Sequence, residues 1–464
     1  NPSGNLFLAN NLSLLSSVSV ADVESYSAPT GITIYTYGAV TVKNTNVSGI
    51  NGGGAGLYIE QQGGGSGAVS ISGGTYESNG GTAGITIFAI GNVSLTNVTA
   101  NYNGKDGVRV DSTGAAAPRT VTVTGGNFQG NTWNGLAVDS LGSITVSNSR
   151  AFYNGIRGFD LDNDGPTGVG TITVTATGSN YTVVYGNSSD GIQASSNRNI
   201  LINRVDSRSN SSASGLFLAN SDATYGTGNV TVTNSILINN QIGITISTRG
   251  SVLIDRVTAN DNFGRGLNVA VDLSVVKPVN IYRSTFISNS NDGVLVLSAG
   301  PVTLNGVTAS ENSGYGVAIN NNNGVAQSIT VLSSYGANTM SFNNSTGMYL
   351  LSNGQISITG VTANNNFGVG IQLSNYDGGT GTGKVIVNSV LTQNNSGGDS
   401  VGRYGGLTIY SNGPVEVNNL RSFQNGSGSS GYGIYIETYN NNNAKISNSQ
   451  IVGNYNSGIY AYLV

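Results

Sequence analysis

Hydrophobic residues recur along the chain in short alternating runs, each followed by small and polar residues. A clear example is the segment from Gly84 to Gly107, GITIFAIGNVSLTNVTANYNGKDG. Its apolar residues stand one and three positions after the first glycine, then nine and eleven, then fourteen and sixteen. Alternation with a period of two predicts strands that bury one face. The segment therefore predicts three short strands and no helix.

The same pattern repeats over the whole chain at intervals of 23 to 36 residues, with shorter and longer intervals alternating until the last. We call the glycine before the first strand of each repeat the anchor. The anchors are Gly4, Gly31, Gly56, Gly84, Gly107, Gly135, Gly158, Gly191, Gly215, Gly243, Gly266, Gly293, Gly316, Gly347, Gly370, Gly406, Gly433 and Gly458. A fixed repeat of this length predicts a chain that winds one turn per repeat and stacks each turn on the last.

Two columns of residues mark the predicted corners of these turns. A glycine stands seven positions after the anchor in seven of the eight short repeats, and Arg198 replaces it in the eighth. We expect these glycines to form a bend. Asparagine stands four positions before the next anchor in many repeats, where it suits a left-handed conformation and predicts a ladder of stacked amides. These residues are Asn103, Asn131, Asn154, Asn187, Asn239, Asn262, Asn289, Asn312, Asn343, Asn366 and Asn454.

With its GITIFAIG-type first strand and corner and its VTANYNG-type third strand, the chain resembles the right-handed parallel β-helix proteins. That group includes pectate-lyase-like enzymes, phage tailspikes and large repeat-containing bacterial surface proteins. The resemblance implies an all-β fold of about 17 turns, with three short strands per turn and alternating short and long turns.

Residues 1–464 are expected to form a single domain. Repeats stand at both ends of the sequence, at Asn5–Leu8 and Gly458–Val464, without a capping helix. We therefore expect the solenoid to continue beyond this sequence or to stack end to end.

The composition excludes several kinds of chemistry. With no histidine and no cysteine, the chain cannot form a Ser-His-Asp triad, a Cys-His pair, a disulfide or a zinc site of the usual kind. Its 18 Lys and Arg against 22 Asp and Glu give no basic field for nucleic acid. No apolar run is long enough to span a membrane.

Charge is concentrated between residues 105 and 164. Asp111, Asp139 and Asp162 stand four positions after successive anchors, so they are expected to point outward in a column, with Arg109 beside them. Such a patch could hold Ca²⁺ against an acidic sugar while an arginine acts as the base or charge clamp of a polysaccharide lyase. The alternative is a solvated patch of ion pairs.

Within this patch, Asp160-Leu-Asp162-Asn-Asp164-Gly165 matches the opening of a calcium loop. Thr171 stands where an EF-hand would have its closing glutamate, which excludes an EF-hand. Asp160, Asp162 and Asp164 are therefore the predicted ligands of a single Ca²⁺ in a turn. The alternative is an ordinary Asp-Gly turn.

Tyrosine is frequent, with 23 residues against 11 phenylalanines. Outward-facing tyrosines of the first strands could bind sugar rings or protein surfaces, or could simply fill strand positions. These residues are Tyr35, Tyr58, Tyr349, Tyr410, Tyr435 and Tyr460, of which the pair Tyr435 and Tyr460 is expected to stack.

These features predict an extracellular structural protein that contributes to a surface fibre, sheath or adhesive stalk by end-to-end or lateral assembly. No catalytic residues are assigned. The alternatives are a calcium-assisted polysaccharide lyase and a carbohydrate-binding adhesin. The expected partners are further copies of the chain, a larger parent polypeptide or a polysaccharide.

Overall fold

A computed structural model describes residues 6–9, 16–63, 67–220, 226–322, 326–376, 381, 383–397, 405–426, 431–440 and 442–463. The chain divides into two compact units, Asn1–Thr231 and Val232–Val464. The anchor Gly4, the start of the first predicted repeat and Val464 lie outside the described residues. The prediction of one domain over residues 1–464 stays a prediction.

The N-terminal unit consists of coils with up to three strands each, as the three runs of each repeat predicted. Its first strands are β1 (Leu6–Ala9), β4 (Ile32–Thr36), β7 (Leu57–Gln61), β10 (Ile85–Phe88), β13 (Val108–Asp111), β16 (Leu136–Asp139), β19 (Phe159–Asn163), β22 (Ile192–Ser196) and β25 (Ser214–Asn220). Its second strands are β2 (Val18–Ala21), β5 (Val40–Lys43), β8 (Val69–Ser72), β11 (Val93–Thr96), β14 (Val121–Thr124), β17 (Ile144–Ser147), β20 (Ile172–Thr175) and β23 (Ile200–Asn203). Its third strands are β3 (Glu24–Tyr26), β6 (Asn46–Ser48), β9 (Thr75–Glu77), β12 (Thr99–Asn101), β15 (Asn127–Gln129), β18 (Arg150–Phe152), β21 (Thr182–Tyr185) and β24 (Val205–Arg208).

The C-terminal unit has the same plan, and β26 (Val230–Thr233) contains the dividing residues. Its first strands are β28 (Ile242–Thr248), β31 (Leu267–Val271), β34 (Val294–Leu297), β37 (Val317–Asn321), β40 (Met348–Ser352), β42 (Ile371–Ser374), β44 (Gly405–Ser411), β46 (Tyr432–Thr438) and β49 (Ser457–Leu463). Its second strands are β29 (Val252–Asp255), β32 (Val279–Tyr282), β35 (Val302–Asn305), β38 (Ile329–Leu332) and β47 (Ala444–Ser447), and its third strands are β27 (Ile236–Ile238), β30 (Thr258–Asn260), β33 (Thr285–Ile287), β36 (Thr308–Ser310), β39 (Asn338–Thr339) and β48 (Gln450–Val452). Second and third strands merge in β41 (Ile356–Asn364), β43 (Val385–Gln393) and β45 (Val415–Phe423).

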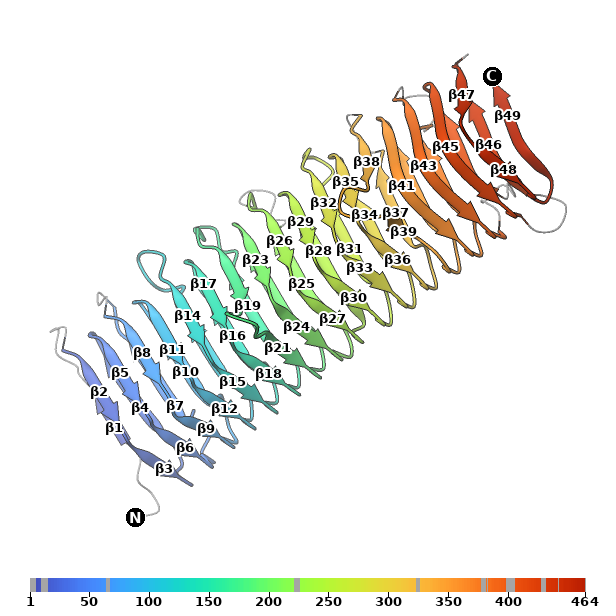
Figure 1. The fold of residues 1–464 in the computed structure, drawn as a ribbon. Helices are drawn as coiled ribbons and strands as arrows, with labels where there is room; N and C mark the ends of the chain where they lie inside the picture. The colour runs from blue at the N-terminus through green and yellow to red at the C-terminus, as the bar shows by residue number, and fades with distance from the viewer. Residues whose placement is uncertain are drawn as a thin grey trace. The chain divides into compact units, whose positions relative to one another are not determined.

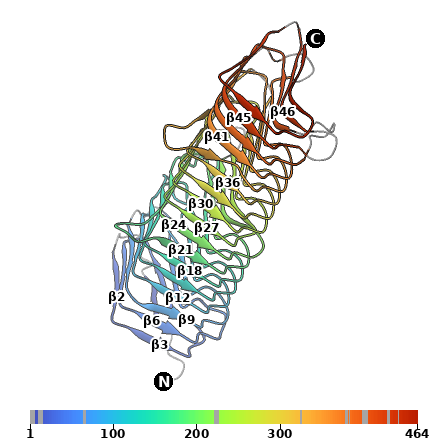
Figure 2. The same cartoon turned by 45° about the vertical axis from the view of Figure 1, so that its right-hand side comes forward.

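Among the described residues, all strand pairings within each unit are parallel and join equivalent strands of successive coils. Strand β10 pairs with β7 on one side and β13 on the other, and Ile85 lies in register with Leu57 and Val108. Figure 1 shows the second strands β2, β5, β8, β11 and β14 side by side, and Figure 2 shows the third strands β6, β9 and β12 in the same order. The all-β parallel β-helix is therefore confirmed. The described residues hold nine first strands in each unit, which agrees with the predicted number of turns.

The core lies between the strands of each coil, where the alternating pattern placed it. In the coil that starts at Gly84, the six apolar positions named from the sequence are all at most 2% exposed: Ile85, Ile87, Val93, Leu95, Val98 and Ala100. The alternating outward residues on the same strands are less buried, as Thr86 and Ser94 illustrate. Because each coil stacks the same residue types on those of its neighbours, the core continues from coil to coil.

The predicted asparagine ladder is present in both units. In the N-terminal unit each Nδ2 donates to the Oδ1 of the next asparagine over 2.9–3.0 Å, through Asn79, Asn103, Asn131, Asn154, Asn187 and Asn210. In the C-terminal unit the bonds measure 2.8–3.4 Å and join Asn240, Asn262, Asn289, Asn312, Asn343, Asn366, Asn395, Asn425 and Asn454. Asn239 is not a member, because its neighbour Asn240 takes the ladder position.

The ladder asparagines are not the left-handed residues that the sequence analysis predicted. The positive φ belongs instead to the residue just before each one, for example 56° at Tyr102 and 53° at Tyr153. The turn therefore places the amide inside the coil and the preceding side chain outside. Asn103 is 1% exposed and Tyr102 is 56% exposed.

Anchor and corner glycines are required for close stacking between coils. A Cβ on the anchor Gly84 would lie 2.7 Å from Asn103 Nδ2 and 2.8 Å from the carbonyl oxygen of Gly107. A Cβ on the corner Gly142 would clash with the carbonyl oxygen of Arg119 in the preceding coil. The predicted bend is present at Gly142. Its φ lies outside the left-handed region, so close contact with the neighbouring coil is what requires glycine there.

Long coils gain their length between the first and second strands, and a buried amide closes the base of several of these loops. Gln61 Nε2 donates to the carbonyl oxygens of Gly38 (2.9 Å) and Gly67 (2.7 Å), and its Oε1 accepts from the backbone N–H of Ile90 and Gly91. Asn163 makes the equivalent pair of donations to Gly142 and Gly170. The corresponding segments Asn220–Gly228 and Asn375–Gly383 lie partly outside the described residues.

None of the described residues belongs to a helix long and apolar enough to cross a membrane.

Candidate functional site

Two outward rows of side chains cover the first sheet of the N-terminal unit. Strand pairing brings Tyr35, Glu60, Phe88, Asp111 and Asp139 into one row, which continues to Asp162. The adjacent row, two residues earlier on each strand, contains Tyr58, Arg109 and Asp160. Residues from different repeats thus form one continuous surface.

The N-terminal half of this surface is aromatic. Phe7, Tyr35, Tyr58 and Phe88 come from successive strands, and the centroids of neighbouring rings lie 5.7, 5.8 and 5.9 Å apart. Neighbouring rings are tilted by 51° to 56°. Phe7 is 62% and Phe88 38% exposed, while Tyr35 and Tyr58 are half-buried. Phe7 and Tyr58 belong to one of the two outward rows, and Tyr35 and Phe88 belong to the other. We call these four residues together the aromatic row.

A hollow of about 510 Å³ adjoins the aromatic row. Its lining includes Tyr58, Glu60, Phe88, Asp111 and Thr113. The Tyr58 hydroxyl donates to Glu60 Oε2 over 2.7 Å, and burial together with this bond raises the pKa of Tyr58. Asp111 Oδ1 accepts from the backbone N–H (3.0 Å) and the hydroxyl (2.7 Å) of Thr113. The tyrosine and threonine thereby orient both carboxylates. We call this the aromatic-acidic hollow.

Beyond Asp111 the surface becomes acidic. Asp111, Asp139 and Asp162 lie in register on three successive strands, so the predicted outward column is confirmed. A second hollow of about 220 Å³ is lined by these three residues together with Thr113, Ser140, Leu141, Asp164 and Gly165. Arg109 Nη2 donates to Asp139 Oδ2 over 2.7 Å. The residues considered for a lyase are therefore brought together, with Arg109 bound to a carboxylate.

Arg157 connects the acidic surface to a buried corner. Its Nη1 lies 3.1 Å from Asp160 Oδ2 and its Nε lies 3.6 Å from Asp190 Oδ2. Asp190 Oδ1 accepts from the backbone N–H of Ser214 (2.8 Å), and Asp106 does the same for Asn134 (3.0 Å) in another coil. Both aspartates precede an anchor glycine, a position that the sequence analysis did not single out.

Burial sets the electrostatics of this corner. It raises the pKa of Asp106, Asp139, Asp160 and Asp190, and the arginines only partly oppose this effect. Arg109 acts on Asp106 and Asp139, and Arg157 acts on Asp160 and Asp190. These carboxylates exchange protons at higher pH than ordinary aspartates.

The predicted calcium ligands occupy one end of β19 and the turn after it. Asp160 contacts Arg157, Asp162 Oδ1 accepts from the backbone N–H of Asp164 (2.9 Å), and Asp164 is exposed. Within the described part of the chain, no group of three or more His, Cys, Asp or Glu residues could hold a metal ion. Ca²⁺ at Asp160, Asp162 and Asp164 stays a prediction.

The predicted outward tyrosines make several ring contacts in the C-terminal unit. Tyr435 and Tyr460 stack with centroids 5.2 Å apart and planes 9° apart, so that pair is confirmed. Tyr410 lies 6.0 Å from Tyr435, and Tyr349 lies 5.9 Å from Tyr315. Tyr410 and Tyr435 are nevertheless buried, at 9% and 5% exposed. They therefore act in packing more than as an open surface.

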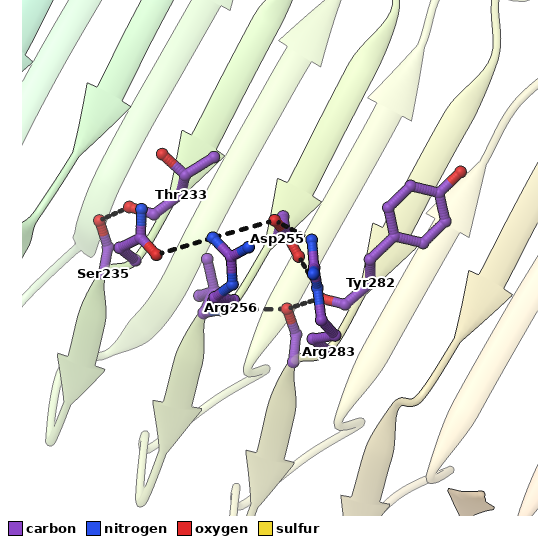
Figure 3. Close-up of polar contacts among 9 residues, drawn as sticks. Thr233, Ser235, Asp255, Arg256, Tyr282 and Arg283 are labelled. Carbon is purple, nitrogen blue, oxygen red and sulfur yellow. Dashed lines mark hydrogen bonds and ion pairs between the residues drawn. The ribbon is translucent and has the colours of Figure 1, made fainter. Parts of the chain in front are cut away.

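A charged cluster in the C-terminal unit has a structural role (Figure 3). Arg283 donates to both carboxylate oxygens of Asp255, over 2.8 and 2.7 Å, and lies over the ring of Tyr335. Arg256 contacts Asp255 (3.6 Å) and Asn234 Oδ1 (3.2 Å). These contacts connect successive coils of the unit and leave both oxygens of the carboxylate engaged.

Three contributors to the candidate site were missed in the sequence. Phe7, Glu60 and Phe88 stand at outward positions of the first strands, the positions at which only tyrosines and aspartates were considered. An inspection of every residue two and four positions after the anchors would have found Glu60 and Phe88. This inspection would not have found Phe7, which stands three positions after Gly4. Its strand pairing with Thr33 nevertheless aligns it with residues that stand two positions after their anchors.

Comparison with known proteins supports the fold. The model of the family described as the right-handed β-helix region matches residues 8–173 and 167–334. No curated protein sequence matches the chain. Among solved structures, the A-modules of the mannuronan C-5 epimerases AlgE4 and AlgE6 of Azotobacter vinelandii are each 12% identical to this chain. The AlgE4 alignment covers 93% of this chain and 91% of that one with a TM-score of 0.21; for AlgE6 the values are 93%, 90% and 0.19.

Proposed function

Because the chain belongs to the right-handed parallel β-helix family, whose fold repeats one surface coil after coil, we propose that it is an extracellular protein that binds a polysaccharide along the first sheet of its N-terminal unit. The observation that carries the proposal is the aromatic row, which leads directly to the aromatic-acidic hollow. An extended ligand could contact both features while it crosses several strands.

The aromatic row supplies apolar faces suited to sugar rings. Tyrosine and phenylalanine present rigid contact area, and the tyrosine hydroxyl adds a polar group at its edge. Each ring comes from a different strand, and the centroids of neighbouring rings lie 5.7 to 5.9 Å apart. The carboxylates of Glu60 and Asp111 supply hydrogen-bond acceptors for hydroxyl groups. A polymer with repeated rings and hydroxyls matches this alternation of apolar and polar groups.

The test is calorimetric titration with a panel of soluble oligosaccharides. We expect Tyr58→Ala and Phe88→Ala each to weaken binding about five- to tenfold, because each removes about 1 kcal/mol of aromatic contact. The matched control is Tyr153→Ala, whose exposed ring contacts Tyr185 (5.3 Å) outside the first sheet. Equal weakening by Tyr153→Ala, or no binding of any oligosaccharide by the unaltered chain, would contradict the proposal.

A structural role in a surface fibre is a second candidate. The observation that favours it is the asparagine ladder, which connects coil to coil in each unit and makes a rigid scaffold. Electron microscopy of concentrated protein tests it, since discrete particles without ordered assemblies would argue against a fibre. The calcium-assisted lyase stays a prediction, tested by release of unsaturated sugars from acidic polysaccharides.

A further inference from the structure

Among the residues that the structure describes, the charged groups that line the aromatic-acidic hollow are Glu60 and Asp111, and no cation lines it. Among the described residues neither carboxylate forms an ion pair. Three other aspartates of this surface and the adjoining corner do form ion pairs. Asp139 pairs with Arg109, and Asp160 and Asp190 pair with Arg157. The hollow is therefore a part of the acidic surface whose negative charge is left for a ligand. Asp162 also forms no ion pair among the described residues, but it lines the second hollow, which has no aromatic lining there.

In the described part of the chain, each of these carboxylates keeps one oxygen that accepts no hydrogen bond. Glu60 Oε2 accepts from Tyr58, and Asp111 Oδ1 accepts from Thr113. Within the described residues Glu60 Oε1 and Asp111 Oδ2 receive no such donation. Both side chains are half-buried and held by these bonds, so the oxygens are oriented in advance of binding.

The ring of Phe88 stands between the two carboxylates in the strand register. Glu60 and Asp111 are separated by two strand spacings, or about 10 Å, comparable to the length of a disaccharide. Tyr58 and Phe88 also present aromatic faces, which attract cations. Two unpaired carboxylates beside aromatic rings are the chemistry that recognises an organic ammonium group.

We infer that the aromatic-acidic hollow selects glycans that carry free amino groups, such as polymers of glucosamine, over neutral and acidic glycans. This inference rests on the proposed function and specifies its ligand class. A protonated amine can donate to Glu60 Oε1 or Asp111 Oδ2 while the sugar ring contacts Phe88 or Tyr58. A uronic acid would bring a third carboxylate to a site without a cation, so it is disfavoured.

The experiment compares three oligosaccharides of equal length in low salt: glucosamine, N-acetylglucosamine and galacturonic acid hexamers. The first two share a backbone and differ in the charge of the amine. We expect glucosamine hexamer to bind at least about tenfold more tightly than N-acetylglucosamine hexamer. Its affinity should also fall as salt is raised. Galacturonate should bind most weakly, with or without 5 mM Ca²⁺.

The double variant Glu60→Gln, Asp111→Asn should remove the preference, so that the glucosamine and N-acetylglucosamine hexamers bind with similar affinity. The matched control is Glu77→Gln on β9, which removes one carboxylate outside the hollow. Asn101 donates to Glu77 Oε1, and the amide oxygen of glutamine can accept the same bond. Equal affinity for all three hexamers, or stronger binding of galacturonate, would overturn the ligand class alone. If none binds, the proposed function itself fails.

Discussion

At the scale of single residues, asparagine is selected for the ladder because its amide both donates and accepts. Asn154 Oδ1 accepts from Asn131 through its backbone N–H (3.1 Å) and its Nδ2 (3.0 Å). Its own Nδ2 donates to Asn187 Oδ1 (2.9 Å) and to the carbonyl oxygen of Phe128 (3.2 Å). Four bonds to the two neighbouring coils thus converge on one side chain that is 1% exposed.

Asn154→Ala should lower the free energy of unfolding by about 3 kcal/mol. The substitution leaves the Asn131 N–H and the Phe128 carbonyl buried without this partner, and each such group costs about 1–3 kcal/mol. Urea unfolding followed by circular dichroism measures the change. Thr145→Ala, on the outward face of the same coil, is the control and should alter the value by less than about 0.5 kcal/mol. A similar loss in both variants would show that the ladder has no special role.

Sequence spacing identified most of the ladder but not all of it. Counting four residues back from an anchor missed Asn79 and Asn210, which stand five residues before Gly84 and Gly215. The chain between the ladder and the next anchor varies in length, whereas the hydrogen bonds fix the position of the amide. The same count selected Asn239 in place of Asn240 for this reason.

At the scale of elements, the strands could be predicted and the site could not. Alternation within one repeat is enough to place Ile85, Ile87 and Val93 in the core. The aromatic-acidic hollow instead combines Glu60, Phe88 and Asp111, which are separated by 28 and 23 residues and come together only through the strand register. The charge patch was found because its aspartates recur at one position, whereas the hollow mixes residue types.

Corner stacking makes an element-scale prediction for glycine. Gly142→Ala should destabilise the fold by about 1–3 kcal/mol, because its Cβ would clash with the backbone of Arg119 in the preceding coil. Gly114 in the loop of a long coil is the matched control, since a Cβ there would meet no atom within 4 Å. Gly114→Ala should be neutral or slightly stabilising. Thermal unfolding of both variants checks the contrast, and equal midpoints would contradict it.

At the scale of the whole molecule, the absence of histidine controls how stability responds to pH. No side chain of the usual histidine type titrates between about pH 5 and 8. The four aspartates with raised pKa, Asp106, Asp139, Asp160 and Asp190, therefore contribute to the response on the acid side of neutrality. The surface carboxylates Asp272 and Glu416 have lowered pKa values. Their contribution to stability is therefore present above their unfolded pKa and is lost as the pH falls through their folded pKa.

The free energy of unfolding should rise as the pH is lowered from neutrality toward about 3.9, the ordinary pKa of aspartate. A raised pKa means that the folded state holds the proton more tightly, so this contribution is complete below the unfolded pKa of about 3.9 and is lost as pH rises through the folded value. Urea unfolding at several pH values measures the slope. Asp106→Asn should reduce the slope and stabilise the protein at pH 7, since an amide oxygen can still accept from Asn134.

An asparagine already occupies the equivalent position in the next coil, because Asn134 precedes the anchor Gly135 as Asp106 precedes Gly107. Asn134 Oδ1 accepts from the backbone N–H of Arg157 over 3.1 Å. Stability that falls steadily on acidification over this range would contradict the role assigned to the buried aspartates.

The left-handed residue before each ladder asparagine has a consequence for engineering. Its side chain lies outside the coil, and the protein already tolerates tyrosine, serine, glutamate and phenylalanine there, at Tyr102, Ser209, Glu311 and Phe342. Within each unit these positions recur once per coil, at the strand spacing of about 4.8 Å. Each unit is therefore a natural molecular ruler, on which dyes, peptides or catalytic groups could be attached at a chosen pitch without disturbing the amides behind them.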